Sequence, residues 1–301
     1  MTFAIRQATL TGTFTALMFA QAACAQTNWT LESPDSRITI RVSPASLGRA
    51  ELTYSVTYDE RAVLSHSPLG IARKDQCFTD NLRFVRAGDI RTIDETYAMM
   101  SGKRRTCRNL ANEQTLVFQN AGGAKVELIV RAYNDGVAFR YRFPEQSQDK
   151  HTVTDESTGF RLPIGVKIWA HPYDKPTKYT PAYETYYVNG VEVGAPSPSE
   201  SGWAFPLLAC TADRSHWILL TEAGLEPSYC GTRLAPSAPN GLYTIRFPDE
   251  GEGNFTGQIE PSSTLLRPCP GPRPGESSSS AIPWATSSNP LWSPTCARPR
   301  R

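Results

Sequence analysis

The segment from Val126 to Phe143 constrains the fold more than any other stretch of the chain, and it reads VELIVRAYNDGVAFRYRF. Apolar residues occupy every second position on both sides of a central Asn134-Asp135-Gly136, namely Val126, Leu128, Val130, Val137, Phe139, Tyr141 and Phe143. A period of two predicts β-strands. Asp-Gly favours a tight turn in which Gly136 has a positive φ, and Pro144 ends the second strand because it cannot donate to a ladder. The segment therefore predicts an antiparallel hairpin with one face on a core.

Residues 1–25 have the pattern of a secretory signal peptide. An uncharged stretch follows Met1 to Gln7 and ends in the small residues Ala23-Cys24-Ala25, which predicts cleavage before Gln26 and a periplasmic or secreted protein. Two alternatives remain. A transmembrane anchor would need roughly 20 apolar residues, more than this stretch contains. Lipidation of Cys24 would place Gln21 where an aliphatic residue is usual. We therefore expect no stable membrane anchor.

Length and charge limit what the mature chain can be. Residues 26–267 are long enough for one large β domain. The formal net charge is +2, which gives no electrostatic footprint for nucleic acid. We therefore expect a neutral molecule as the partner.

Four cysteines lie in this region, namely Cys77, Cys107, Cys210 and Cys230. Export to an oxidising compartment permits disulfides. The spacing suggests Cys77 with Cys107 and Cys210 with Cys230, although four cysteines allow three connectivities. None of the four has zinc-ligand spacing.

Short alternating apolar runs follow one another along the rest of the chain. They include residues 38–42, 52–58, 116–118, 166–170, 217–221 and 242–247, separated by Gly, Pro, Asn and Asp. Such strands, together with the lack of a three-turn amphipathic helix outside the signal peptide, predict an all-β fold with a large antiparallel β-sandwich.

The segment from Trp169 to Val188 differs chemically from its neighbours. It reads WAHPYDKPTKYTPAYETYYV and is rich in tyrosine. Rings with polar tips suit a surface that stacks on a sugar and hydrogen bonds to it, so Trp169, Tyr183 and Tyr187 are candidate substrate-binding residues. The alternative is an aromatic rim that packs on another domain. Glu184 is the carboxylate most enclosed by rings, although most glutamates on a surface are simply solvated.

Seven motifs occur in a family-like order: WTLESPDSRITIRV, SHSPLGI, YAMMSGKRR, NLANEQTLVF, RAYNDGVAFRYRF, YETYY and LTEAGL. From Trp29 to about Arg267 the chain resembles the N-terminal domain of glycoside hydrolase family 97, which comprises exported bacterial α-glucosidases and related α-galactosidases. The resemblance implies a sandwich of the super-sandwich type. It also implies that this sandwich packs on a catalytic (β/α)8 barrel and contributes to the wall of the active site.

The resemblance further implies a calcium ion beside the catalytic carboxylates, with one ligand from this domain. Glu184 in YETYY matches the position of that ligand. Calcium prefers carboxylate oxygens, and the role that the family implies for it is Lewis-acid assistance at the glycosidic oxygen.

The resemblance ends near Arg267. Residues 268–301 are rich in proline and serine and lack strand alternation, which predicts a tail that is disordered or out of frame. A natural linker is the alternative. The catalytic barrel is then missing as the intramolecular partner, and we assign no catalytic residue to this chain.

Three functions follow from these expectations. The first is the substrate-contacting and calcium-contributing domain of an α-glycosidase that cleaves α-glucosides, inactive alone because cleavage needs two carboxyl groups. The second is a carbohydrate-binding sandwich without catalysis. The third is a structural remnant with an exposed docking face.

Overall fold

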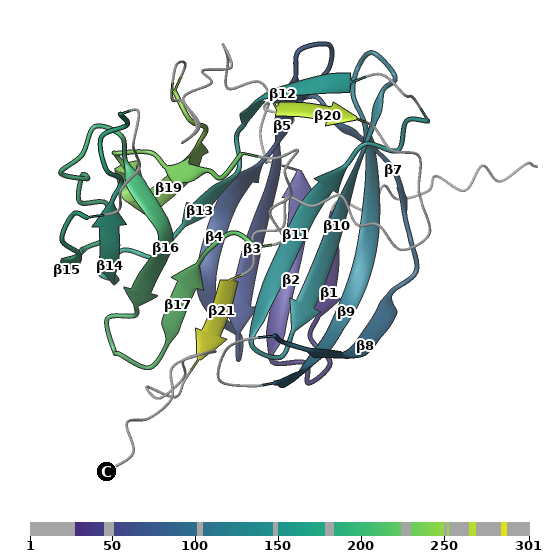
Figure 1. Ribbon diagram of the computed structural model, residues 1–301. Coiled ribbons are helices and arrows are strands. Elements are labelled where there is room, and N and C mark those ends of the chain that lie inside the picture. The colour runs from purple at the N-terminus through teal and green to yellow at the C-terminus, as the bar shows by residue number, and fades with distance from the viewer. Residues whose placement is uncertain are drawn as a thin grey trace, which may run out of the picture.

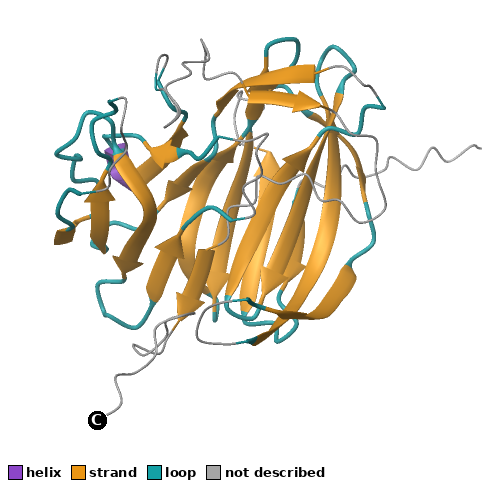
Figure 2. Ribbon diagram, viewed as in Figure 1, coloured by secondary structure: helices purple, strands orange, loops and turns teal. Residues whose placement is uncertain are grey.

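A computed structural model describes residues 28–44, 51–100, 105–146, 150–177, 184–223, 230–249, 252, 265–268 and 284–287. These residues form strands joined by loops and one short 3-10 helix, Pro239–Gly241 (Figure 2). The predicted all-β class is confirmed. Within this part of the chain no helix has the length and apolar character needed to cross a bilayer. The predicted signal peptide lies outside the described residues.

The first layer is a four-stranded antiparallel sheet in the order β1-β2-β3-β4. Its strands are β1 (Trp29–Glu32), β2 (Ile38–Pro44), β3 (Leu52–Tyr58) and β4 (Arg61–Leu69). On β3 every second residue from Leu52 to Tyr58 is buried, and the serine and threonines between them are half-exposed. The period-two pattern of the sequence therefore places one face of this sheet on the core.

The second layer is a large sheet in the order β13-β19-β18-β16-β17-β21-β11-β10-β9-β7. Its strands are β13 (Gly159–Arg161), β19 (Leu242–Arg246), β18 (Arg233–Leu234), β16 (Trp203–Cys210), β17 (Trp217–Leu220), β21 (Trp284–Ser287), β11 (Gly136–Arg142), β10 (Lys125–Tyr133), β9 (Thr106–Gln119) and β7 (Arg83–Ala87). Three further strands join it: β14 (Lys167–Pro172) pairs with β15 (Val188–Glu192) and β16, and β8 (Arg91–Ala98) pairs with β9.

A third, smaller sheet covers one end of the sandwich (Figure 1). Its order is β20-β12-β5-β6, with β20 (Leu265–Pro268), β12 (Lys150–Glu156), β5 (Ile71–Arg73) and β6 (Cys77–Phe78). The core lies between the first two sheets, where rings from opposite layers meet. Trp29 on β1 meets Phe118 on β9 at 5.3 Å between centroids, and Tyr54 on β3 meets Phe139 on β11 at 5.1 Å. Figure 1 shows these two layers face to face. The predicted sandwich is confirmed.

The predicted hairpin is strands β10 and β11, paired antiparallel with Leu128 opposite Tyr141. Its turn differs from the expectation in one respect. Tyr133 pairs directly with Gly136, so Asn134 and Asp135 alone form the turn and Gly136 is the first residue of β11. None of the positive-φ residues of the described chain lies in this turn. The expectation of a positive φ at Gly136 was wrong because the turn begins one residue earlier.

Two strands lie at or beyond the expected start of the tail, where no strand was predicted. β20 pairs with β12, and β21 lies between β11 and β17, with Ala285 opposite both Gly136 and Leu219. A strand can pair through its backbone without an alternating sequence, which explains why the pattern missed these two. The domain boundary at residue 267 stays a prediction.

The expected disulfides are not formed, since Cys77, Cys107, Cys210 and Cys230 all keep reduced side chains. Cys77 lies on β6 opposite Ala72, whereas Cys107 lies on β9 opposite Tyr97. Sequence spacing was misleading here because it does not show which strands become neighbours. The Sγ of Cys210 lies 3.6 Å from the carbonyl oxygen of Thr211.

Candidate functional site

Trp169 lies on the outer face of β14. Ile168 and Ala170, on either side of it, are buried in the core, while Lys167 is exposed and Trp169 is half-buried. On β15 the residue opposite Trp169 is Asn189, and the pairing shifts register beside it. Gly190 has a φ of +67°, and a side chain there would begin 3.6 Å from the Trp169 ring. That distance is an ordinary van der Waals contact, so it is the positive φ that favours glycine at this position.

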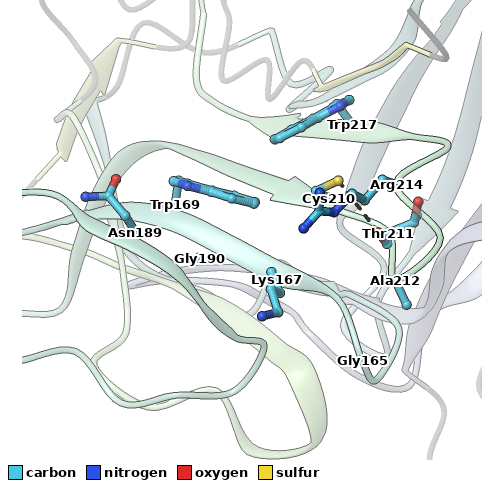
Figure 3. A pocket seen from close by; sticks show the side chains of 10 residues that line it. All are labelled: Gly165, Lys167, Trp169, Asn189, Gly190, Cys210, Thr211, Ala212, Arg214 and Trp217. Carbon is cyan, nitrogen blue, oxygen red and sulfur yellow. Dashed lines mark hydrogen bonds between the residues drawn. The ribbon is translucent and has the colours of Figure 1, made fainter. Parts of the chain in front are cut away.

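A second indole reaches the same face from another strand. Cys210 on β16 is opposite both Lys167 on β14 and Trp217 on β17, so these residues form one row across three strands. The rings of Trp169 and Trp217 lie 5.1 Å apart with an interplanar angle of 43°. We call these two rings the aromatic strip, and Figure 3 shows the Trp217 ring offset above the Trp169 ring.

A pocket of about 670 Å³ lies beside this strip, and we call it the indole pocket (Figure 3). It is lined by Gly165, Lys167, Trp169, Asn189, Gly190, Cys210, Thr211, Ala212, Arg214 and Trp217. This volume lies in the range of small-molecule sites. Among the described residues, the lining combines two apolar rings, one amide and two cations, and no carboxylate. It therefore offers a stacking surface and hydrogen-bond donors to a polar ligand with a flat apolar face.

The loop between β16 and β17 presents Arg214 to the indole pocket. One carboxylate oxygen of Asp213 accepts hydrogen bonds from Thr211 Oγ1 at 2.7 Å, from Ser215 Oγ at 2.6 Å and from the Ser215 backbone N–H at 3.0 Å. These donors, the Ser215 hydroxyl first, hold the pKa of Asp213 well below its usual range. The Arg214 N–H closes the turn onto the Thr211 carbonyl at 2.8 Å. The loop is therefore held in one conformation by its own polar groups.

Tyr187 extends the aromatic surface along β14. His171 is two residues after Trp169 on β14, and the pairing of β14 with β16 shifts register between them. Its ring meets that of Tyr187 at 4.9 Å between centroids, and its Nε2–H donates to the Thr185 carbonyl at 2.7 Å. The Thr185 hydroxyl in turn donates to the Pro172 carbonyl at 2.9 Å. Tyr187 thus lies against the strand that carries Trp169, whereas Tyr183 lies outside the described residues.

Glu184 directly precedes Thr185, whose carbonyl accepts the hydrogen bond from His171. Its side chain is exposed and forms no ion pair with any residue that the structure describes. The described ranges also contain no group of three or more His, Cys, Asp or Glu side chains arranged to hold a metal. Calcium takes six to eight oxygen ligands. An exposed carboxylate fits one such ligand, but these residues do not make a coordination shell.

Sequence reasoning missed four lining residues: Lys167, Asn189, Arg214 and Trp217. One signal was available for Trp217, which stands with Leu219 on the less buried side of an alternating strand. An aromatic residue on the outer side of a strand suggests a surface that binds a ligand or packs against another domain. Lys167, Asn189 and Arg214 gave no such signal, since single polar residues next to turns are usual on any surface.

Comparison with known proteins gives one family. The family described as Glycosyl-hydrolase 97 N-terminal matches residues 31–287. A probable retaining α-galactosidase of Streptomyces bingchenggensis is 28% identical over 239 residues, which are 78% of this chain and 35% of that protein. A retaining α-galactosidase of Bacteroides thetaiotaomicron is 26% identical over 168 residues, 56% of this chain and 24% of that protein.

Solved structures give the same picture. A crystal structure of a β-arabinopyranosidase has 30% identity and a TM-score of 0.73, and the match covers 86% of this chain and 39% of that one. A glycoside hydrolase family 97 enzyme from Pseudoalteromonas sp. strain K8, in complex with acarbose, has 20% identity and a TM-score of 0.62 over 86% of this chain and 35% of that one. The second likeness shows the fold alone. The chain thus spans well under half the length of each of these proteins.

Proposed function

The chain belongs to the glycosyl hydrolase 97 N-terminal family, and from this premise we propose that it is the substrate-contacting β-sandwich domain of an α-glycoside hydrolase. One observation carries the proposal. The sandwich presents a pocket of about 670 Å³ whose wall includes two adjoining indoles, and Tyr187 contacts His171 on the strand that carries Trp169. Indoles stack on the C–H faces of sugar rings, and the polar groups around them hydrogen bond to hydroxyls.

The residues have distinct roles in this proposal. Trp169 and Tyr187 contact the saccharide, and Trp217 continues the stacking surface. Glu184 provides one carboxylate ligand for a calcium ion. The general acid and its partner carboxylate come from a (β/α)8 barrel outside this chain, because glycoside cleavage needs two carboxyl groups at a set separation.

The substrate in this proposal is an α-linked oligosaccharide. The sequence resemblance favours α-glucosides. The relatives named as α-galactosidases make α-galactosides the competing substrate, and the related structure that contains acarbose supports a saccharide ligand in general. An assay should therefore include both sugar series.

A carbohydrate-binding sandwich without catalysis is the second candidate. The observation that favours it is that the indole pocket is lined entirely by residues of this chain. Binding at that pocket would then require no further domain.

The test measures binding and turnover on the same protein. Maltotriose and α-1,4-galactobiose are titrated while the indole N–H resonances of Trp169 and Trp217 are followed by NMR. We expect shifts of both resonances and weaker binding for Trp169→Ala and Tyr187→Ala. Tyr97→Ala is the matched control, because Tyr97 is a half-exposed tyrosine on β8, away from the pocket. Absence of binding in every variant and in the parent would reject the proposal.

The turnover arm uses an aryl α-glucoside and an aryl α-galactoside, with and without calcium. We expect no hydrolysis by the 301-residue protein and weak calcium binding that Glu184→Gln removes. Hydrolysis that Glu184→Gln abolishes would show that this chain holds a complete active site, contrary to the division of roles proposed above.

We also propose that the protein is exported to the periplasm or secreted. The small-residue site before Gln26 supports this. The intact mass of protein recovered from outside the cytoplasm should correspond to a chain that begins at Gln26.

A further inference from the structure

We propose that the indole pocket selects an acidic saccharide, whose ring stacks on Trp169 and Trp217 while its carboxylate is held by Arg214 and Lys167. The inference rests on the proposed function, since it specifies the class of sugar that the same pocket takes. A uronic-acid unit is the chemical class that fits.

The charge of the lining is the first argument. The two charged side chains described in the pocket wall, Lys167 and Arg214, are both cations. Neither is neutralised by a strong ion pair. Lys167 Nζ lies 3.7 Å from Glu192 Oε1, and both side chains are more than half exposed, at 54% and 66%. An exposed pair at that distance contributes little and leaves the ammonium free to turn towards a ligand.

The second argument concerns Arg214. The carboxylate next to it in the sequence, that of Asp213, already interacts with other residues. Asp213 Oδ1 accepts hydrogen bonds from Thr211 and Ser215. Asp213 Oδ2 lies 3.3 Å from Nη1 of Arg61. In the part of the chain that the structure describes, the Arg214 guanidinium forms no ion pair. The pocket therefore presents a planar, permanently charged donor of the kind that binds carboxylates with two hydrogen bonds.

The backbone at Arg214 gives the third argument. Its φ is +57°, a conformation that glycine or asparagine adopts more readily than a long side chain. The hydrogen bonds of the loop hold the residue there. The turn therefore fixes the position from which the Arg214 side chain leaves the loop. Figure 3 shows Arg214 directed from the loop towards the space beside the indoles.

The indoles and the cations of the pocket would contact different groups of one ligand. The face of an indole carries partial negative charge and so accepts the C–H face of a sugar ring but not a carboxylate. Lys167 and Arg214 line the same pocket as the two indoles. A neutral sugar would use the rings and hydrogen bonds to its hydroxyls, whereas a uronic acid would add charge-assisted hydrogen bonds to the cations.

The experiment compares two ligands that differ only in this group. α-1,4-digalacturonate and α-1,4-galactobiose share linkage and stereochemistry, and inorganic phosphate serves as a bare anion. Each is titrated into the full chain while the indole resonances of Trp169 and Trp217 are followed. We expect digalacturonate to bind about tenfold more tightly than galactobiose, because of the charge-assisted hydrogen bonds. Of the two disaccharides, only digalacturonate should bind more weakly as the salt concentration is raised.

Variants locate the effect. Arg214→Asn removes the charge with a residue that tolerates positive φ, and Lys167→Gln removes the other charge. The double variant should lose the tenfold preference, because its affinity for digalacturonate should fall much further than its affinity for galactobiose. Lys125→Gln, an exposed lysine at the start of β10 that does not line the pocket, should change neither affinity. If Arg214→Asn does not fold, Lys167→Gln and the salt dependence of the parent protein still decide the matter.

The failures can be told apart. Equal affinities for the two disaccharides would overturn the acidic preference and leave saccharide binding intact. Phosphate bound as tightly as digalacturonate would also overturn it, because the site would then recognise charge without a sugar. No binding of any saccharide would reject the proposed function together with this inference.

Discussion

The guanidinium carbon of Arg233 lies 4.4 Å from the centroid of the Tyr173 ring, inside the domain. The side chain of Arg233 is only 1% exposed, and it donates to Asp249 Oδ2 and Glu252 Oε2, each at 2.8 Å. Tyr173 follows directly after β14, and its backbone N–H donates to the Gly202 carbonyl at 2.8 Å. This contact therefore fixes the end of the strand that carries Trp169.

Arg233→Met should destabilise the protein by about 3 kcal/mol, because it leaves the Glu252 carboxylate, which is largely buried, without its partner. Urea unfolding monitored by circular dichroism measures the change. Arg37→Met is the control, since Arg37 pairs with Asp59 on the surface and both side chains are 47% exposed. Equal destabilisation by the two substitutions would contradict a structural role for the buried arginine.

Gly202→Ala should cost about 3 kcal/mol or more, because two effects act together. Gly202 has a φ of +99°, and an added Cβ would lie 2.0 Å from the carbonyl oxygen of Leu234. Gly231→Ala is the matched control, since nothing lies within 4 Å of its Cβ position, and we expect a change of about 0.5 kcal/mol or less. The thermal midpoints of both variants give the comparison. Similar midpoints would show that the close approach of Gly202 to Leu234 on β18 relaxes easily.

Glu113→Gln should lower stability at neutral pH, with a loss that shrinks in acid. Burial by itself would raise the pKa of Glu113, but its hydrogen bonds to Arg131, at 2.6 Å, and to Arg91 hold that pKa below the usual value. A lowered pKa in the folded state contributes stability above the unfolded pKa, and this contribution is lost as pH falls through the folded pKa.

The measurement for Glu113 is the free energy of unfolding of parent and variant from pH 7 to pH 3. We expect a difference of about 2 kcal/mol at pH 7 that approaches zero at the acid end. Glu200→Gln, at an exposed carboxylate, should show no such convergence. A difference that is constant with pH would show that the substitution acts through packing and not through charge.

The four described cysteines should be recovered as reduced thiols and not as disulfides. Cys77 is exposed and should react with a thiol reagent in the folded protein, whereas Cys210 is 3% exposed and should react only after unfolding. Burial raises the pKa of the Cys230 thiol to about 12, which keeps it protonated and slow at neutral pH. Peptide mapping of protein isolated without reductant checks this result. A peptide that links Cys77 to Cys107, or Cys210 to Cys230, would contradict the structure.

Local patterns in the sequence determined the class of the fold and its most regular parts. The hairpin of β10 and β11 was predictable because alternation of apolar residues reports which side of a strand is buried. Composition led to Trp169 and Tyr187 as candidates, since a run of rings with few aliphatic neighbours indicates an aromatic surface, and their role in binding stays a prediction. The order of seven motifs was sufficient to suggest the family.

The site itself depended on the tertiary structure. Trp169 and Trp217 meet only because β16 lies between their strands, and nothing near either residue in the sequence specifies that order. Pairing between strands uses backbone N–H and C=O groups, which every residue except proline has in full, so neighbours and register leave little trace in side-chain pattern. The same reason explains why the position of β21, the free cysteines and the conformation of Gly136 became clear only when the sheets were assembled.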